Sequence, residues 1–350
     1  TLAEVLAEVG YHTGIFGKWH LGDEEPYQPH RRGFQETFIH GAGGIGQAYD
    51  CSCADAPGNK YFDPIIRHNG RFVQTEGFCT DIFFRAALGW IDSVKDDKSP
   101  FFAYIATNAP HGPFIAPDKN RQRFKQLGFS ENHAGYYGMI ENIDENMGLL
   151  LDRLAGWKLM KNTVVIFMSD NGMASSGSGV AGQRLGALAD GTPLRGFNAG
   201  MKGYKGSVEE GGVRVPCFFR WDGHIKPDRD LNFPTAHIDL FPTLASLAGS
   251  PVPEDQVEGE NLLPFFLDSQ SPAPRYFFTH QGRWPVGADP DTHQWRNFAV
   301  RDDRFRLVGE EALYDMVRDP SQTENVIGKH RAEADRLRSN YDAWWQKTRG

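Results

Sequence analysis

The stretch Gly10–Gly22, GYHTGIFGKWHLG, is a short apolar run that ends in polar residues. Its centre, TGIFGKW, predicts a short buried strand, because β-branched and aromatic residues follow one another between glycines. Lys18 and His20 stand where this strand would end. A strand that runs into the edge of a sheet usually carries apolar residues at such positions. A cation and an imidazole there suggest that the strand end binds something.

Regular elements are predicted on both sides of this strand. An apolar stripe at helical spacing predicts a helix over residues 1–9 that stops at Gly10. Further helices are predicted over 81–95 and about 133–157, and strands over 100–107, 162–170 and 214–221. Helices therefore alternate with strands through about residue 250, which indicates an α/β fold with a parallel sheet covered on both faces. Residues 23–69, rich in Gly, Pro and polar residues, predict a long irregular excursion.

The pattern of predicted elements changes after the proline-rich segment GSPVPEDQ. Short strand-like pieces follow, and then a terminal helix, HRAEADRLRSNYDAWW. We therefore predict a main domain over residues 1–255 and a C-terminal subdomain over 256–350, built from a small antiparallel sheet and a helix.

Composition excludes several classes of partner. The chain has 37 basic and 45 acidic residues and a formal charge of -8, which argues against nucleic acid or an acidic membrane as the main partner. No apolar run approaches the roughly 18 residues of a membrane-spanning helix, and no signal peptide opens the chain. The cysteines form no CxxC motif and do not settle the compartment; they are Cys51, Cys53, Cys79 and Cys217.

Polar residues also follow the later strands. His111 lies in NAPHGP, Asp170 and Asn171 lie in SDNG, and Lys202 and Lys205 lie in a Gly-rich loop before strand 214–221. Each motif alone is typical of an ordinary turn or a solvated surface. Together they stand at successive strand ends, where ligands of open α/β sheets bind. Lysines suit a tetrahedral oxyanion and Asp and Asn oxygens suit Ca²⁺ or Mg²⁺, so the set predicts a site for a sulfate or phosphate ester.

The motifs resemble those of the type I sulfatases. GYHTGIFGKWHLG is similar to the second signature of that family, and ATNAPHGPF, VVIFMSDNG and GYKGSVEEGGVRVP are similar to its later motifs in the same order. HIDLFPTLASLAG and LYDMVRDPSQTENV resemble a downstream helix and the C-terminal subdomain. The resemblance implies an alkaline-phosphatase-like α/β fold, with a mostly parallel sheet sandwiched between helices and a small C-terminal antiparallel sheet with a helix.

The resemblance also implies an arylsulfatase-like sulfuric ester hydrolase and a role for each motif. Lys18 would bind the substrate sulfate, and His20 would contact the second hydroxyl of the nucleophile and help to expel sulfate. His111 and Lys205 would bind sulfate oxygens and the bridging oxygen, and either could donate a proton to the leaving alcohol. Lys205 is preferred to Lys202 because it precedes Gly-Ser upstream of Glu-Gly-Gly.

Two cofactors follow from the same resemblance. One calcium ion would be bound by Asp170 and Asn171. The nucleophile would be a formylglycine hydrate made from Cys or Ser in a C/S-x-P-x-R motif, which the sequence lacks; SPAPR at Ser271–Arg275 is a near miss. We expect that motif, and a strand with further acidic calcium ligands, to lie in a segment before Thr1. The chain as written is therefore expected to be inactive, to bind calcium weakly at best, and to fold poorly because strand edges are exposed.

Other functions remain open from the residues. One is a phosphate-ester hydrolase or phosphotransferase of the same superfamily, and another is a non-catalytic binder of sulfated glycans or an inactive fragment. The expected partner is a small-molecule or glycan sulfate ester, with no nucleic acid and no membrane insertion. The resemblance implies export to the periplasm or the outside of the cell.

Overall fold

The computed structural model describes residues 1–41, 43–46, 55–179, 182–253, 255–267 and 271–349. Cys51 and Cys53 lie outside these ranges. The chain divides into two compact units that interleave along the sequence. Unit 1 comprises Thr1–Thr163, Leu185–Leu194 and His237–Leu263, and unit 2 comprises Val164–Arg184, Arg195–Ala236 and Pro264–Gly350. The boundary after residue 255 stays a prediction.

Unit 1 contains a five-stranded sheet in the order β4-β3-β2-β1-β5. Its strands are β1 (His12–Lys18), β2 (Glu36–His40), β3 (Ile65–His68), β4 (Arg71–Gln74) and β5 (Phe101–Ala106). Strand β1 pairs in parallel with both β2 and β5, whereas β3 and β4 extend the sheet antiparallel. The predicted strand around residues 13–19 is thus flanked on both sides by parallel neighbours.

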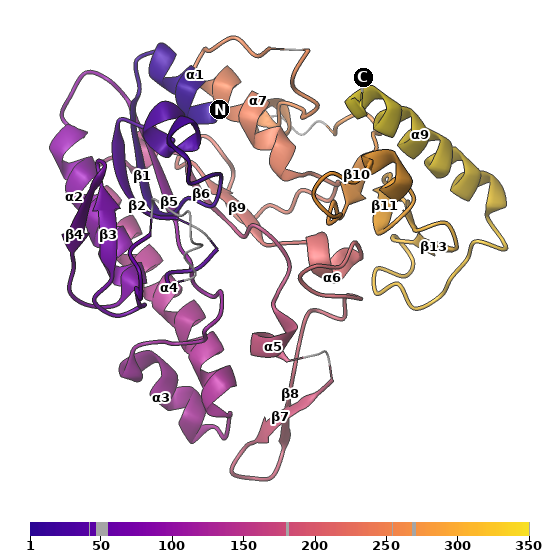
Figure 1. The fold of residues 1–350 in the computed structure, drawn as a ribbon, viewed down its shortest axis with the longest axis horizontal. Helices are drawn as coiled ribbons and strands as arrows, with labels where there is room; N and C mark the ends of the chain where they lie inside the picture. The colour runs from indigo at the N-terminus through magenta and orange to yellow at the C-terminus, as the bar shows by residue number, and fades with distance from the viewer. Residues whose placement is uncertain (42, 47–54, 180–181, 254, 268–270, 350) are drawn as a thin grey trace. The chain divides into compact units, whose positions relative to one another are not determined.

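Both faces of this sheet are covered by helices. Successive side chains of a strand point to opposite faces, so Ile15 and Phe16 pack into different clusters. Phe16 packs with Phe83 and Met139, and Ile15 packs with Ala3. Figure 1 shows α1 and α2 beside the strands. The helices concerned are α1 (Leu2–Glu8), α2 (Cys79–Val94) and α4 (Glu131–Gly156).

The remaining helices of unit 1 are short. Helix α3 packs against α4, and α7 packs against α1. Their bounds, with those of the 3-10 helices, are α3 (Asp118–Gln126), α7 (Leu240–Leu247), η1 (Glu25–Tyr27), η2 (Pro29–Arg31), η3 (Met160–Asn162) and η4 (His237–Asp239).

The prediction of a long irregular excursion over residues 23–69 was wrong. This stretch contains β2, the direct parallel neighbour of β1, and also β3. Strand β2 has the sequence ETFIH, only five residues long and polar at both ends. A strand so short carries too few alternations for a periodic pattern to stand out. Strand β2 is recognisable by its pairing with β1 and not by its own composition.

Unit 2 contains two sheets whose strands pair antiparallel. Strands β6 and β9 form one pair, and β10, β11, β12 and β13 form a four-stranded sheet in that order. Parallel pairing in the described ranges is thus found in β2-β1-β5. The bounds are β6 (Val165–Met168), β9 (Cys217–Arg220), β10 (Phe277–His280), β11 (Phe298–Arg301), β12 (Phe305–Val308) and β13 (Ala312–Asp315).

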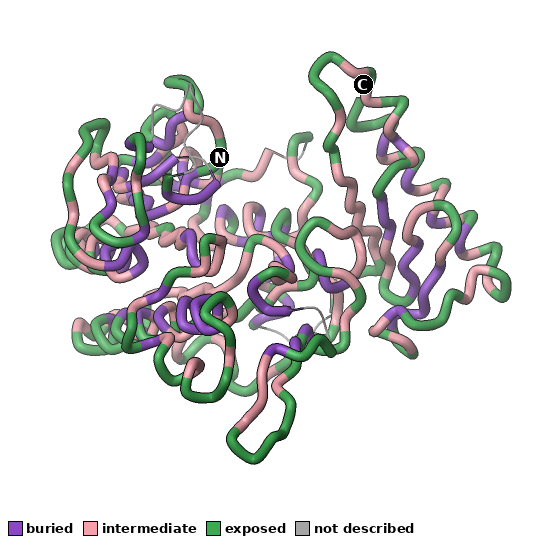
Figure 2. The backbone as a smooth tube through the Cα atoms, turned by 60° about the horizontal axis from the view of Figure 1, so that its bottom comes forward, coloured by how far each residue is buried: buried purple, intermediate pink, exposed green. Residues whose placement is uncertain are grey.

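The C-terminal helix α9 (Arg331–Arg349) covers the four-stranded sheet. Its buried residues, Leu337, Tyr341 and Trp345 among them, recur every three or four positions and so form one stripe. The stripe packs on Phe298 and Leu307 of the sheet, and Figure 2 shows buried and exposed segments alternating along the C-terminal end of the chain. The predicted antiparallel sheet with a helix is confirmed.

The other elements of the chain are small. They are the hairpin β7 (Arg184–Ala187) and β8 (Pro193–Arg195), the helices α5 (Ser175–Ser178), α6 (Glu210–Val213) and α8 (Leu263–Leu267), and η5 (Pro290–His293). Within the described ranges, no helix is both long enough and apolar enough to span a membrane.

Candidate functional site

The end of β1 is fixed by Trp19. Its side chain is 6 % exposed and packs in the cluster on the α1 face, and its indole Nε1–H donates to the carbonyl oxygens of Gly22 and Tyr27 at 3.1 and 3.0 Å. Lys18, just before it, is half-buried, and His20, just after it, is exposed with a positive φ of 54°. The buried tryptophan therefore holds the backbone from which both predicted site residues project.

A glycine brings the end of β1 close to β5. Gly17 has φ +117°, and a Cβ atom built there would lie 2.1 Å from the carbonyl oxygen of Ala106. Any other residue would collide with the backbone of β5 and adopt a strained conformation. The strand preceding Lys18 thus requires glycine at this position.

Tyr61 holds the turn that carries His111. The Tyr61 hydroxyl donates to the carbonyl oxygens of His111 and Gly112, both at 3.1 Å. Burial raises the pKa of Tyr61 to about 12, so the phenol keeps its proton. The His111 N–H donates to the Asn108 carbonyl at 2.8 Å, and its Nδ1 lies 2.8 Å from the Gly112 oxygen. The contact at Nδ1 therefore orients the imidazole, and the second ring nitrogen, Nε2, is not part of that contact.

His40, which sequence reasoning missed, belongs to the same region as Lys18, His20 and His111. His40 ends β2 in register with Lys18, is fully buried, and stacks on Phe83 with ring centroids 5.9 Å apart. Burial is the main reason that the pKa of His40 is lowered to about 3; the backbone hydrogen bond to Gly41 acts against this, and the nearby basic side chains Lys18, His20 and His111 add to the lowering. The three predicted residues of unit 1 therefore all lie within electrostatic reach of His40. The sequence signal for His40 would have been a polar residue at the end of a strand. It was missed because residues 23–69 were predicted to be irregular.

Asp170 and Asn171 follow β6 in unit 2, as predicted. The Asp170 carboxylate is exposed. The Asn171 side-chain Nδ2 donates to the Gly172 carbonyl at 2.8 Å, and the Ser169 hydroxyl donates to the Asn171 carbonyl at 3.1 Å. These bonds fix the orientation of the Asn171 amide and shape the turn.

The loop of Lys205 is joined to this turn through the backbone. The Lys205 N–H donates to the Met173 carbonyl at 2.9 Å, and the Gly172 N–H donates to the Gly212 carbonyl at 2.9 Å. A Cβ atom at Gly172 would lie 2.0 Å from the Gly211 carbonyl oxygen, so the two segments touch at their backbones. Unit 2 therefore brings Asp170 and Asn171 next to the loop of Lys205.

The two lysines of this loop have different surroundings. The Lys202 ammonium donates to the Tyr314 hydroxyl at 2.8 Å and lies 4.9 Å from the centre of that ring. The hydrogen bond to Tyr314 raises the pKa of Lys202. Both lysines are exposed, but Lys202 anchors the loop to β13 through Tyr314.

A buried carboxylate just after the loop was also missed by sequence reasoning. Glu210 is 1 % exposed. Arg301 Nη1 lies 3.0 and 2.9 Å from its two oxygens, Arg306 Nη2 lies 2.5 Å from Oε2, and Arg214 Nη1 lies 3.4 Å from Oε1. Burial lowers the pKa of Arg306 to about 10. These contacts bind the start of α6 to β11 and β12 in unit 2.

The donor set at Asp170 and Asn171 fits a calcium ion in kind but not in number. Carboxylate and amide oxygens are the ligands that Ca²⁺ prefers, and Ca²⁺ takes six to eight of them. In the part of the chain that the structure describes, no group of three or more His, Cys, Asp or Glu residues could hold a metal ion. Asp170 and Asn171 would therefore fill only part of a calcium coordination sphere.

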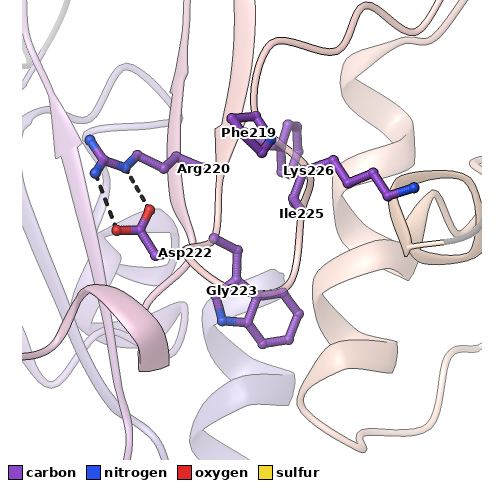
Figure 3. Close-up of a pocket in the computed structure, with 8 residues that line it drawn as sticks. Phe219, Arg220, Asp222, Gly223, Ile225 and Lys226 are labelled. Atoms are coloured by element: carbon purple, nitrogen blue, oxygen red, sulfur yellow. Dashed lines mark hydrogen bonds and ion pairs between the residues drawn. The ribbon is translucent and has the colours of Figure 1, made fainter.

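A pocket of about 470 Å³ lies elsewhere in unit 2, lined by residues 219–223 and 225–227. Figure 3 shows the Arg220 guanidinium paired with the Asp222 carboxylate, while the Lys226 ammonium points away from that pair. None of the predicted site residues lines this pocket.

Comparison with known proteins identifies the chain. A family model described as sulfatase matches residues 1–250, and a model of the C-terminal region of N-sulphoglucosamine sulphohydrolase matches residues 204–341. The mouse (Mus musculus) N-acetylgalactosamine-6-sulfatase is 32 % identical over 275 residues, 77 % of this chain and 49 % of that protein. The uncharacterized sulfatase YdeN of Escherichia coli K12 is 29 % identical over 299 residues, 78 % and 48 % of the two chains. The chain spans about half the length of these relatives.

Solved structures agree with the fold. Ps i-CgsB, crystallised in complex with k-i-k-neocarrahexaose, superposes with a TM-score of 0.80 at 27 % identity, covering 99 % of this chain and 74 % of that one. The PsFucS1 sulfatase from Pseudoalteromonas sp. shares the fold with a TM-score of 0.74 at 18 % identity, covering 100 % of this chain and 73 % of that one. The predicted alkaline-phosphatase-like α/β fold is confirmed. Because the sulfatase model spans residues 1–250 of a 350-residue sequence, the chain belongs to the sulfatase family.

Proposed function

We propose that the protein is a sulfuric ester hydrolase that cleaves a glycan sulfate ester to an alcohol and sulfate. Membership of the sulfatase family supports the reaction. The carrahexaose bound by the related Ps i-CgsB supports a glycan as the substrate. The observation that carries the proposal is the cationic group of unit 1, where Lys18, His20 and His111 all act on the buried His40. We also propose that the protein works in the periplasm or outside the cell.

The cationic group has the chemistry that a sulfate ester needs. The ester is a tetrahedral anion, and the Lys18 ammonium offers a point charge with three N–H donors. The His111 imidazole is oriented by its Nδ1 bond to the backbone. When protonated at Nε2, it can donate that proton to the oxygen of the leaving alcohol. General-acid help of this kind typically contributes about 10²–10⁴-fold to the rate.

In unit 2 we assign sulfate binding to Lys205 and calcium binding to Asp170 and Asn171. A bound calcium ion would supply charge that stabilises the nucleophile and the developing oxyanion. The proposed nucleophile is a formylglycine hydrate. Because the 350 residues contain no C/S-x-P-x-R motif, we expect no hydrolysis of an aryl sulfate by this purified chain.

Calorimetric titration with inorganic sulfate and with a sulfated monosaccharide tests the cationic group. Lys18→Ala should weaken binding by about 10- to 100-fold, because a hydrogen bond to a charged group contributes about 1.5–3 kcal/mol. Lys98→Ala is the matched control: Lys98 is an exposed lysine of the same unit that precedes β5. Unaltered binding in Lys18→Ala would remove the proposed group from consideration. Tighter binding of phosphate than of sulfate would favour a phosphate-ester hydrolase instead.

A further inference from the structure

His40 has one ring nitrogen occupied and the other open. Its Nδ1 lies 2.8 Å from the Gly41 carbonyl oxygen. A carbonyl oxygen only accepts, so Nδ1 carries the proton in the neutral ring and Nε2 carries a lone pair. Within the described ranges, this buried Nε2 has no hydrogen-bond partner. Leaving a buried acceptor unpaired is costly, so a donor is expected to reach it in the working protein.

The ring cannot satisfy itself by taking up a second proton. His40 is fully buried against Phe83, and three basic side chains act on it electrostatically, namely Lys18, His20 and His111. A proton on Nε2 would place one more buried positive charge among these groups. His40 is therefore held as a neutral acceptor, and it is a poor base for catalysis.

The register of the sheet indicates the donor. Phe16 pairs with Phe38 and Lys18 pairs with His40 in the parallel β1-β2 ladder. In-register residues of neighbouring strands lie about 4.8 Å apart and point to the same face. Phe38 and His40 both contact Phe83, so both face α2. The Lys18 ammonium has three N–H groups, whereas a sulfate monoester carries no proton on its sulfate oxygens at neutral pH.

We propose that His40 is a positioning residue that accepts a hydrogen bond from the Lys18 ammonium at Nε2 and so orients that ammonium for sulfate. This role rests on the proposed function of Lys18 as a sulfate ligand. His40 itself does not touch the sulfate. It acts as a fixed neutral acceptor that selects one orientation of a flexible lysine side chain, and so reduces the entropy that lysine would lose on binding.

Two variants of His40 test the roles of its two ring nitrogens separately. In His40→Asn the side-chain amide N–H replaces the Nδ1 donor to Gly41 and nothing replaces Nε2. In His40→Gln the longer side chain can place its carbonyl oxygen where Nε2 was. We expect about tenfold weaker binding of inorganic sulfate in His40→Asn and binding within about threefold of the wild type in His40→Gln. The melting temperatures of both variants show whether a loss reflects unfolding.

Imidazole ¹⁵N NMR on histidine-labelled full chain tests the pair without any ligand. We expect His40 to show a protonated Nδ1 and an unprotonated Nε2, and the Nε2 resonance to move in Lys18→Met. An unchanged Nε2 resonance in that variant would overturn the pairing. So would an Nε2 resonance that moves only when a sulfated monosaccharide is added, since the donor would then be a sugar hydroxyl. Wild-type sulfate affinity in folded His40→Asn would overturn the positioning role.

The same data separate this proposal from the function on which it rests. If the wild-type chain binds no sulfate and Lys18→Ala changes nothing, the proposed sulfate site fails. The NMR result for His40 and Lys18 then still decides the pairing on its own.

Discussion

Two buried polar side chains, His40 in unit 1 and Glu210 in unit 2, are accommodated in opposite ways. The two carboxylate oxygens of Glu210 accept hydrogen bonds from Arg301, and Oε2 also accepts one from Arg306. His40 gives up its charge, and within the described ranges its Nε2 has no partner. A saturated buried group is typical of a structural anchor, whereas an open one is typical of a site where something else binds. Of the two side chains, His40 is therefore the one that can still accept a hydrogen bond from another group.

The largest expected effect comes from breaking the ion-pair cluster of Glu210. Glu210→Ala leaves Arg306, 4 % exposed, without its carboxylate partner. Removing one partner of a buried ion pair typically costs about 3–5 kcal/mol. Urea unfolding should therefore show a large loss of stability. The adjacent Glu209→Gln is the matched control, because Glu209 lies 3.7 Å from an exposed lysine and should cost less than about 1 kcal/mol. Equal losses in the two variants would contradict a special role for Glu210.

The second prediction concerns the pH dependence caused by His40. Its pKa is lowered from 6.5 to about 3 on folding. Between these values the unfolded chain binds a proton that the folded chain does not, so the free energy of unfolding falls as the pH is lowered through this window. The slope from one such group is at most about 1.4 kcal/mol per pH unit.

Urea unfolding at pH 7, 5 and 4 measures this slope in the wild type and in His40→Asn. The variant lacks the titrating ring, so its stability should fall less steeply on acidification. The other titrating groups are common to both chains and cancel in the comparison. Parallel pH profiles would mean that His40 already carries its proton in the folded state.

The smallest expected effect concerns the hydroxyl that holds the His111 turn. Tyr61→Phe removes a donor to the carbonyl oxygens of His111 and Gly112. A net loss of about 1 kcal/mol is expected for such a hydrogen bond, together with weaker sulfate binding because His111 is less well oriented. Tyr27→Phe, at a tyrosine that is 49 % exposed, is the control. If Tyr61→Phe left both stability and sulfate affinity unchanged, the turn would be held by its backbone alone.

The local sequence predicted those helices and strands whose own apolar residues form a recognisable pattern. The helix predicted over 81–95 is observed as Cys79–Val94, and the strand predicted over 100–107 is observed as Phe101–Ala106. Lys18, His20 and His111 could be proposed as site residues because a charged or imidazole side chain at a strand end is unusual in itself. The structure then adds that all three act on one buried ring.

The residues that sequence reasoning missed depend on partners far along the chain. Glu210 meets Arg301 and Arg306, which lie 91 and 96 residues later, and the Tyr61 hydroxyl meets His111 and Gly112, 50 and 51 residues later. His40 lies in a strand of five residues that is defined by pairing with β1. Nothing in the composition of these segments encodes the contact, because the fold supplies the second half of each interaction.

The glycine-mediated contact between the turn of Asp170 and the loop of Lys205 has a mechanical consequence. With the backbone of Gly172 against that of Gly211, and Met173 hydrogen-bonded to Lys205, neither segment has room to slide past the other. A displacement of the Asp170 turn is therefore expected to move the Lys205 loop with it. If the calcium ion proposed above binds at Asp170, the position of Lys205 would depend on whether that ion is present.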